Sequence, residues 1–445
     1  MNICRTASGL LVLALFMTLG CSSGSDSTTA QSTTAAPQVV TTEHSTKPAE
    51  STPAPAPQPD AGVVRAELSM LSPNMSGVSG QPYLSVDPAG AFLLSWLEET
   101  PEEGTALRFA RRTPGSPAWS EPVTVASGPN WFVNWADVPS VVAGPGHFAA
   151  HWLVRSEEGP GGYDAWVSRS DADGLQWTEP RRLHDDTSLA EHGFVSLLPR
   201  PDGSTLAVWL DGRAFAQDNP EMSLRSRIMV RDGSLGPETV VDSKTCDCCP
   251  TALAATPGLG ALSVWRDRTD DEVRDIATSR FSAGVWTPPE VIAADNWVMP
   301  GCPVNGPVLS MRGERAVVAW FTGEGDRPRV QVAFSFDTGA TFTTAFPVME
   351  GSPLGRVGAV LLSDGSALVS WLDAGDGDLE AGVRLRRIAK DGRREAIVSI
   401  AAVTGGRATG VPVLALSSDE LMLAWTEPGD AQRVRVGTMP LSRVP

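Results

Sequence analysis

Seven apolar runs, each containing a tryptophan, recur along the chain at a nearly constant interval. These tryptophans are spaced by 51 to 57 residues, and they are Trp96, Trp152, Trp209, Trp265, Trp320, Trp371 and Trp425. Such a regular period indicates a repeat architecture, in which each repeat is one supersecondary unit. No segment shows the sustained 3.6-residue periodicity of a long helix, and the 43 glycines and 36 prolines also disfavour long helices.

Each repeat carries the pattern of four short strands. A turn such as "DPAG" or "RPDG" precedes the tryptophan strand, an alternating strand such as "ALRFARR" follows it, and a short strand such as "EPVTVA" closes the unit. The pattern predicts an all-β fold, a seven-bladed β-propeller with four-stranded antiparallel blades. Six blades are the alternative count, and stacked β-sandwiches would not keep one period so evenly.

The last repeat ends after "QRVRVGTMPL" and lacks an outer strand. The segment "VVRAELSML", residues 63–71, precedes the first repeat and could supply that strand. We predict that residues 63–71 pair beside the strand around Val434–Val436. Closing the ring with strands from both ends of the chain would remove exposed sheet edges.

The N-terminal segment differs in composition from the repeats. Arg5 is followed by the apolar run "GLLVLALFMTLG" and then Cys21. The run is short for a membrane span, so residues 1–20 are predicted to be a signal peptide. Residues 21–62 are rich in Ser, Thr, Ala and Pro and poor in large apolar residues, which predicts a disordered tether. The propeller is then expected over residues 63–445.

The four residues "TLGC" resemble a bacterial lipobox. The resemblance implies that Cys21 is lipidated and that the exported protein is anchored to a bacterial membrane, in the periplasm or outside the cell. Ser22 after the cysteine favours the outer membrane or the cell surface. An ordinary signal peptide or a short anchor is the alternative.

The net charge limits the classes of partner. The chain has 52 acidic and 35 basic residues, for a formal charge of -17. A strongly acidic protein is repelled by phosphate backbones and by anionic lipid, so nucleic acid is not expected as a partner.

The stretch "SFDTGATF" resembles the Asp-box, or BNR repeat, of sialidase-like propellers. It contains Ser335, Asp337, Gly339 and Phe342 at the spacing of that motif. The resemblance places the motif between the third and fourth strands of a blade, where the Asp caps its own turn and the Gly takes a strained backbone angle. Asp-boxes occur in sialidases, other glycosidases and non-enzymatic binders, so the motif implies the fold more than an activity.

The catalytic residues of sialidases are poorly matched in this chain. That family uses an arginine triad, an aspartate acid and a late tyrosine nucleophile paired with a glutamate, whereas this chain has only Tyr83 and Tyr163, both in early repeats. Asp137 in "WADVPSVV" is a weak match for the acid. Asp137, Asp211 and Asp267 are therefore weak catalytic candidates, and the catalytic residues are not assigned.

One sector of the predicted ring is rich in charged and aromatic side chains. In a propeller, the loops after the tryptophan strands share a face with the leading loops, which are the loops before the first strand of each blade. Guanidinium groups pair with carboxylates, and indoles stack on sugar rings. These residue types predict a pocket formed by Arg213, Arg266, Asp267, Arg268, Arg274, Asp275, Asp295, Trp297 and Asn305. The alternative is an ion-pair network that ties the loops together. Arg356 and Arg407 precede the next two blades.

Half of the six cysteines lie together in the chain. The stretch "TCDCCP" contains Cys246, Cys248 and Cys249, and Cys302 lies in the leading loop of the next predicted blade. Four cysteines in an oxidising compartment predict two disulfides, with Cys248–Cys249 and Cys246–Cys302 as one of three possible pairings. Copper or zinc held by the four thiolates is the alternative. No other cofactor is predicted.

Two functions from different classes remain open. One is a non-catalytic module that binds a glycan or a small anionic ligand on the face of the leading loops. The other is a glycoside hydrolase of the sialidase type or a divergent relative, because abundant carboxylates could supply acid–base chemistry.

Overall fold

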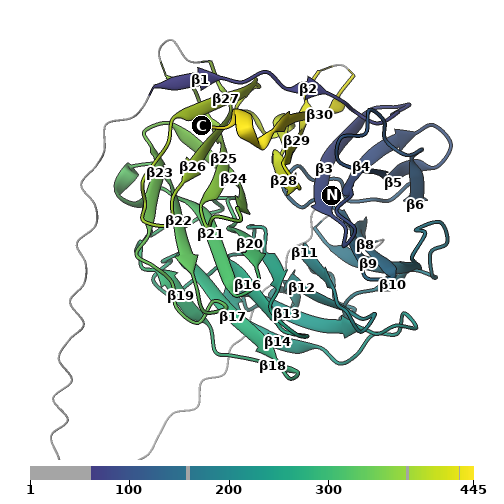
Figure 1. Cartoon of the computed structure of the whole chain (residues 1–445). Helices are drawn as coiled ribbons and strands as arrows, with labels where there is room; N and C mark the ends of the chain where they lie inside the picture. Colours follow the sequence, from purple (N-terminus) through teal and green to yellow (C-terminus); the bar gives the residue numbers. More distant parts are fainter. Residues whose placement is uncertain (1–61, 157–160, 377–379, 430) are drawn as a thin grey trace, which may run out of the picture. The chain divides into compact units, whose positions relative to one another are not determined.

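The computed structural model describes residues 62–156, 161–376, 380–429 and 431–445. Seven β-sheets stand around a ring, viewed along its axis in Figure 1. The predicted seven-bladed propeller is confirmed, and the six-bladed alternative is wrong. The predicted signal peptide, Cys21 and nearly all of the tether lie outside the described residues, so lipid anchoring stays a prediction. Among the described residues, none of the helices has the length and apolar character needed to span a bilayer.

The first three blades each contain four antiparallel strands in chain order from the centre of the ring outward. Their strands are β3 (Ser79–Val86), β4 (Phe92–Thr100), β5 (Gly104–Arg112) and β6 (Val123–Gly128); β7 (Ser140–Gly144), β8 (His147–Arg155), β9 (Tyr163–Asp171) and β10 (Arg181–Arg182); and β11 (His192–Pro199), β12 (Thr205–Asp211), β13 (Met222–Met229) and β14 (Thr239–Thr245).

The next three blades follow the same order, and in the fourth blade two short strands both pair with the third strand. Their strands are β15 (Ala252–Ala255), β16 (Ala261–Arg266), β17 (Ile276–Ser282), β18 (Val285–Trp286) and β19 (Glu290–Ala293); β20 (Val308–Arg312), β21 (Arg315–Thr322), β22 (Arg329–Ser335) and β23 (Phe346–Glu350); and β24 (Pro353–Leu361), β25 (Ala367–Asp373), β26 (Gly382–Ile388) and β27 (Ile397–Ala402).

The seventh blade is completed by the N-terminal segment, as predicted. Its own strands are β28 (Val413–Ser417), β29 (Glu420–Glu427) and β30 (Arg433–Pro440). Strand β2 (Ser69–Met70) pairs antiparallel with β30 and forms the outer edge. The predicted single strand is divided, however, because β1 (Val63–Arg65) pairs in parallel with β27 of the sixth blade. The segment thus joins two neighbouring blades along their outer edges (Figure 1).

The repeated tryptophan lies in the second strand of every blade, and an acidic residue often completes its hydrogen bonding. In three blades the indole Nε1 donates to the carboxylate two residues later: Trp96 to Glu98, Trp209 to Asp211 and Trp371 to Asp373, each at 2.9 Å. In the fourth and fifth blades, Asp242 and Asp295 accept this bond instead. A buried indole N–H without a partner would be costly, so these carboxylates belong to the fold.

The Asp-box forms the turn expected from its sequence. The Ser335 hydroxyl donates to Asp337 Oδ1 at 2.8 Å, and the backbone N–H of Thr341 donates to the same oxygen at 2.9 Å. Hydrogen bonds from Thr341 lower the pKa of Asp337 to about 2. Gly339 has a φ of +78°, and a Cβ there would lie 2.6 Å from Leu262 of the preceding blade. The motif therefore packs one blade against the next.

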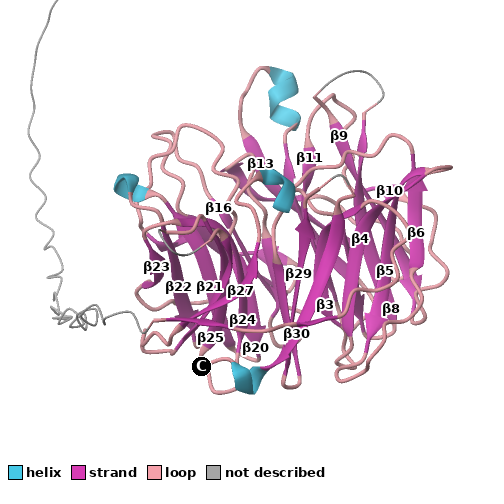
Figure 2. Ribbon diagram, turned by 90° about the horizontal axis from the view of Figure 1, so that it is seen from above, coloured by secondary structure: helices cyan, strands magenta, loops and turns pink. Residues whose placement is uncertain are grey.

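The antiparallel order divides the connections between two faces of the ring. We call the face with the leading loops and the loops between second and third strands the upper face. It carries the short helices η1 (Arg213–Gln217), η2 (Glu324–Asp326) and η3 (Arg407–Thr409), and the other face carries η4 (Leu441–Arg443). Figure 2 shows the first three helices on one side of the blades and the fourth on the opposite side.

Candidate functional site

The predicted pocket residue Arg213 forms an internal ion-pair cluster. Its Nε and Nη2 donate to the two oxygens of Asp211 at 2.6 Å, and Nη2 also lies 2.8 Å from Glu238. Burial disfavours the charge of Asp211, but hydrogen bonds from Arg213 and Trp209 outweigh it and lower the pKa of Asp211. A fully buried carboxylate that is held ionised by two donors is unsuited to act as a catalytic acid.

Arg266 and Trp297 form the centre of a second internal cluster. The Arg266 guanidinium donates to the backbone carbonyls of Asn305, Arg274 and Phe321 at 2.6 to 2.9 Å. Its Cζ lies 5.0 Å from the centre of the Trp297 ring, and Trp297 is only 8% exposed. This cluster holds the leading loop of the fifth blade against the ends of β16 and β21.

The other predicted pocket residues also have partners within the protein. Arg268 and Arg274 both pair with Glu272, Asp275 accepts backbone N–H groups from Asn296 and Trp297, and Asp295 accepts from Trp320 and Gln331. Burial and the neighbouring Asp242 raise the pKa of Asp267 to about 6. These contacts match the ion-pair network that the sequence left as the alternative. A ligand contact by these nine residues stays a prediction.

The innermost strands of all seven blades surround an apolar central channel. It contains a cavity of about 260 Å³, whose lining includes Leu84, Val195, Val308 and Val413. Asp137 lies at this lining among otherwise mostly apolar neighbours. Groups that bind a polar ligand are therefore expected at the mouth of the channel rather than along its walls.

The rim of the channel on the upper face is built from strained backbone. Gln81, Phe194 and Arg356 each have a φ of +51°, at the register shifts of β3, β11 and β24. Non-glycine residues rarely adopt such angles, and strain of this kind concentrates at binding sites. Two of the bulges are capped from a neighbouring blade: the Phe194 N–H donates to Asp137 at 2.8 Å, and the Arg356 N–H donates to Asn305 at 2.7 Å.

Arg356 reaches over the mouth of the channel. Its Nη1 donates to the carbonyls of Gly406 and Gly410 at 2.8 and 2.9 Å, and its Cζ lies 4.5 Å from the centre of the Trp135 ring. Trp135 belongs to the leading loop of the second blade, whereas Arg356 belongs to the sixth. The two side chains therefore meet between distant parts of the ring.

The charge of Arg356 is not neutralised by a carboxylate. Among the described residues it forms no ion pair, and its Nε and Nη2 have no hydrogen-bond partner. Burial and the charge of nearby Arg407 lower the pKa of Arg356 to about 10, so the guanidinium is still charged at pH 7. A half-buried, unpaired cation is unusual in a chain with a net charge of -17.

Asp137 and Tyr163 form a buried pair on the same rim. Asp137 is 1% exposed and accepts a hydrogen bond from the Tyr163 hydroxyl at 3.0 Å. Burial raises the pKa of Asp137 to about 7, and it raises the pKa of Tyr163 well above the usual value. The sequence did not predict this pair, because the sialidase pattern places its tyrosine in the later blades. Asp137 itself was predicted as the weak match to the acid of that pattern.

The Asp137→Asn variant should change how stability depends on pH. Between pH 3.8 and about 7, the unfolded chain ionises at Asp137 while the folded protein keeps the proton. Folding therefore becomes less favourable as pH rises through this window, and the loss is complete above about pH 7. The asparagine side chain has nearly the same shape as that of aspartate, but it has no carboxyl group that titrates.

We expect the variant to gain stability relative to the unsubstituted protein as pH rises from 4 to 8 across this window. Urea unfolding at several pH values measures the difference, with the exposed Asp271→Asn as the control. A difference that does not change with pH would contradict the raised pKa of Asp137.

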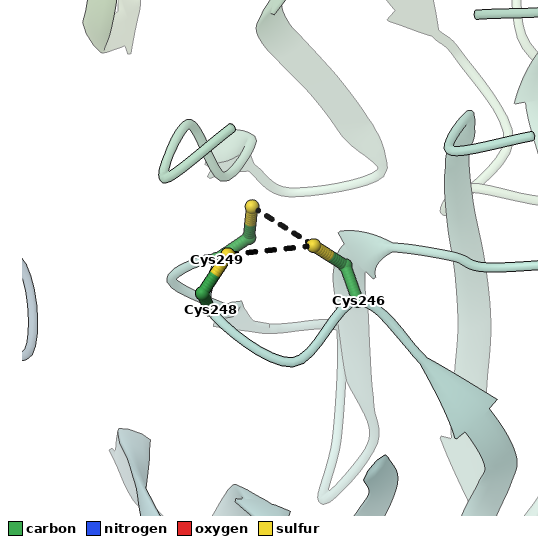
Figure 3. A group of neighbouring side chains, drawn as sticks. All are labelled: Cys246, Cys248 and Cys249. Carbon is green, nitrogen blue, oxygen red and sulfur yellow. Dashed lines mark hydrogen bonds between the residues drawn. The ribbon is translucent and has the colours of Figure 1, made fainter. Parts of the chain in front are cut away.

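The four cysteines of the propeller converge, as expected from their places in adjacent leading loops. Cys246 Sγ lies 3.3 Å from Cys249 Sγ and 4.0 Å from Cys248 Sγ (Figure 3), and Cys302 lies beside Cys248. All four are free thiols in the structure. Hydrogen bonds from Cys248 and Cys249, together with Arg274, lower the pKa of Cys246. Disulfide formation stays a prediction, but these contacts favour Cys246–Cys249 and Cys248–Cys302 over the pairing preferred from sequence.

A second group of potential metal ligands lies between the second and third blades. Asp164, His184 and His192 bring their ligand atoms within 4.8 Å of one another. The two imidazole rings stack at 3.5 Å, and the Nδ1 of His184 lies 3.0 Å from the Asp186 carbonyl. Burial and the neighbouring His184 lower the pKa of His192 to about 4, so that ring is neutral at pH 7.

No family model matches the chain, and no curated protein matches it in sequence. Solved structures share its fold. An ulvan lyase of a polysaccharide lyase family is similar with a TM-score of 0.53 and 13% identity, over 85% of this chain and all of that one.

Two further propellers have lower TM-scores. A Penicillium chrysogenum α-L-arabinanase has a TM-score of 0.47 and 13% identity, over 85% of this chain and 99% of that one. A mutant of the NanB sialidase from Streptococcus pneumoniae has a TM-score of 0.47 and 11% identity, over 84% of this chain and 71% of that one. This chain is thus a propeller that resembles carbohydrate-active enzymes, and at these identities the likeness extends to the fold alone.

Proposed function

We propose that this protein binds an anionic oligosaccharide at the channel rim of the upper face and does not cleave it. The observation that carries the proposal is the half-buried Arg356, which stacks on Trp135 and has no carboxylate partner among the described residues. Guanidinium groups recognise carboxylates through two parallel hydrogen bonds, and the free Nε and Nη2 edge of Arg356 has that geometry.

The surroundings of Arg356 suit a sugar acid. Trp135 offers an aromatic edge, Phe194 and Gln81 stand on the same rim, and the exposed Arg407 adds a second positive charge. The chain as a whole has a net charge of -17, so the two arginines at this rim attract an anion locally against an acidic background. A carboxylate or sulfate on a sugar therefore fits this rim, whereas nucleic acid would be repelled by the acidic protein.

The location of the protein is part of the proposal. A lipid on Cys21 and a tether of residues 22–62 would hold the propeller at the outer surface of a bacterial membrane, where polysaccharides are met. The lipobox-like "TLGC" and the composition of the tether support this placement.

Calorimetric titration with three saccharides tests the proposal. The first is an oligosaccharide of glucuronate and 3-sulfated rhamnose, the type bound in the similar ulvan lyase structure. The second is its carboxyl-reduced, desulfated counterpart, and the third is sialyllactose. We expect saturable binding of the charged oligosaccharide and no binding of the neutral one. Equal binding of both would contradict recognition through Arg356.

A glycoside hydrolase is the second candidate. Asp137 favours it, because a carboxyl group with a pKa of about 7 could donate a proton. Tyr163 opposes a sialidase mechanism, because burial and nearby carboxylates keep its phenol neutral and therefore weakly nucleophilic. We expect no release of product from a fluorogenic sialoside. Turnover that is lost in Asp137→Asn would establish the hydrolase instead.

A further inference from the structure

Three of the four thiols of the propeller form one compact group, and the fourth lies beside one of the three. The ligand atoms of Cys246, Cys248 and Cys249 lie within 4.8 Å of one another, and Cys302 lies within the same distance of Cys248. Cys246 Sγ lies 3.3 Å from Cys249 Sγ and 4.0 Å from Cys248 Sγ. Four sulfurs at zinc–sulfur distances of about 2.3 Å around a tetrahedral centre are about 3.8 Å apart, which is close to this spacing.

The chain holds these thiols in place through its backbone. Cys246 follows β14, and its N–H donates to the Arg266 carbonyl at 3.0 Å. The leading loops of the fourth and fifth blades are in direct contact, because a Cβ on Gly306 would lie 2.0 Å from the Pro250 carbonyl oxygen. Cys302 is thereby brought from the next blade to the thiols that precede β15, as the other three approach one another in Figure 3.

The surroundings compensate the charge that four thiolates would carry. The Arg274 Nη1 donates to Cys246 Sγ at 3.1 Å, and Arg274 is buried. A buried guanidinium beside sulfur offsets part of the negative charge left when thiolates bind a divalent or monovalent cation. Cys302 is exposed, so a cation can reach the group from solvent.

We propose that Cys246, Cys248, Cys249 and Cys302 bind one thiophilic d¹⁰ cation, Zn²⁺ or Cu⁺, in a closed site that clamps the fourth and fifth blades together. Four protein sulfurs leave no open coordination position, which is typical of structural rather than catalytic sites. Binding releases the thiol protons to solvent, so occupancy falls as pH is lowered. The proposal does not depend on saccharide binding.

Metal content is the first test. The full chain is purified without a metal-affinity tag, and zinc and copper are measured per protein by mass spectrometry. We expect about one equivalent of one metal, retained through gel filtration, and Co²⁺ substitution should give the intense thiolate-to-cobalt absorption of a sulfur-rich tetrahedral site. Release by a Cu⁺-specific chelator identifies copper, and release only by a general divalent chelator identifies zinc.

Cysteine variants locate the site. Cys302→Ser removes the exposed ligand with little change to the buried loop, and we expect it to lower metal content at least about tenfold after dialysis against chelator. Asp164→Asn is the matched control, because it removes a ligand from Asp164, His184 and His192, which are the one group of potential metal ligands among the described residues that contains no cysteine. That variant should keep its metal.

Thiol chemistry supplies a measurement that needs no variant. Alkylation of the metal-loaded protein should label few of the four cysteines, and alkylation after chelation should label all of them. Peptide mapping that finds two disulfides and no bound metal would overturn the proposal and support the covalent pairing. Loss of metal in Asp164→Asn but not in Cys302→Ser would overturn it as well.

Discussion

Removal of residues 1–72 is expected to give an aggregation-prone propeller of lower stability, whereas removal of residues 1–61 should leave the fold intact. The longer deletion takes away β2, which is the outer strand of the seventh blade. It also removes Leu71, which makes two hydrogen bonds to the rest of the ring. The Leu71 N–H donates to the Val436 carbonyl at 2.9 Å, and the Leu71 carbonyl accepts the Trp119 indole N–H at 2.6 Å. Strand β30 would then present an open edge for pairing with other chains.

The expected loss can be estimated from the contacts. Each intramolecular hydrogen bond contributes about 1 kcal/mol, and burial of a leucine contributes about 1.5 to 3 kcal/mol. Leu68 packs against the blade at Gly437, where a Cβ would lie 2.6 Å from its Cδ1. The segment therefore contributes several kcal/mol out of a total stability that is typically about 5 to 15 kcal/mol.

A series of three deletions isolates the role of β2. Thermal unfolding and size-exclusion chromatography compare proteins lacking residues 1–61, 1–66 and 1–72. The middle deletion removes β1, whose residues are exposed, and Ala66, whose N–H donates to the Ser399 carbonyl, so it should cost less than the loss of β2. The longest should lower the unfolding midpoint clearly and produce oligomers. Equal midpoints for all three would show that the ring does not need β2 for closure.

Arg356→Met is expected to weaken binding of the charged oligosaccharide by about 10- to 100-fold, because a hydrogen bond to a charged group contributes about 1.5 to 3 kcal/mol. Methionine keeps the unbranched chain against Trp135 but loses the guanidinium. Arg356→Lys keeps the charge without the planar fork, so it should bind with intermediate affinity.

The control for Arg356→Met is Arg327→Met. Arg327 follows η2 on the upper face, and its side chain is 75% exposed beside Glu324. This substitution removes the same charge from the same face and should leave affinity nearly unchanged. Calorimetry measures both variants, and thermal unfolding confirms that both are folded. Equal affinities for the two variants would remove Arg356 from the site.

The repeat pattern was visible in the sequence because it reflects packing inside each blade. Every second strand buries a tryptophan, and the following acid in "WLE" or "WLD" satisfies its indole N–H, as Glu98 does for Trp96. The Asp-box was equally recognisable, because Ser335, Asp337 and Gly339 interact within one turn. Local interactions of this kind leave a regular signal in the chain.

The charged sector shows the limit of such patterns. Alternating Arg and Asp near residues 266–275 predicted either a pocket or an ion-pair network, and residue types alone favoured neither. The structure shows Arg266 and Arg274 buried with partners inside the protein. The packing of neighbouring loops decides which charged side chains remain unpaired, and the repeat pattern of the sequence does not predict that packing.

The sequence by itself determined the blade, the number of blades and the use of an N-terminal strand to close the ring, because these follow from short-range alternation and a fixed period. The tertiary structure decided the candidate site. Arg356 meets Trp135 only when the closed ring brings the sixth and second blades to one rim, whereas Asp137 meets Tyr163, the first residue of β9, within the second blade. Arg356 and Trp135 lie more than two blades apart in the chain, so their contact depends on ring geometry and leaves no pattern in the local sequence.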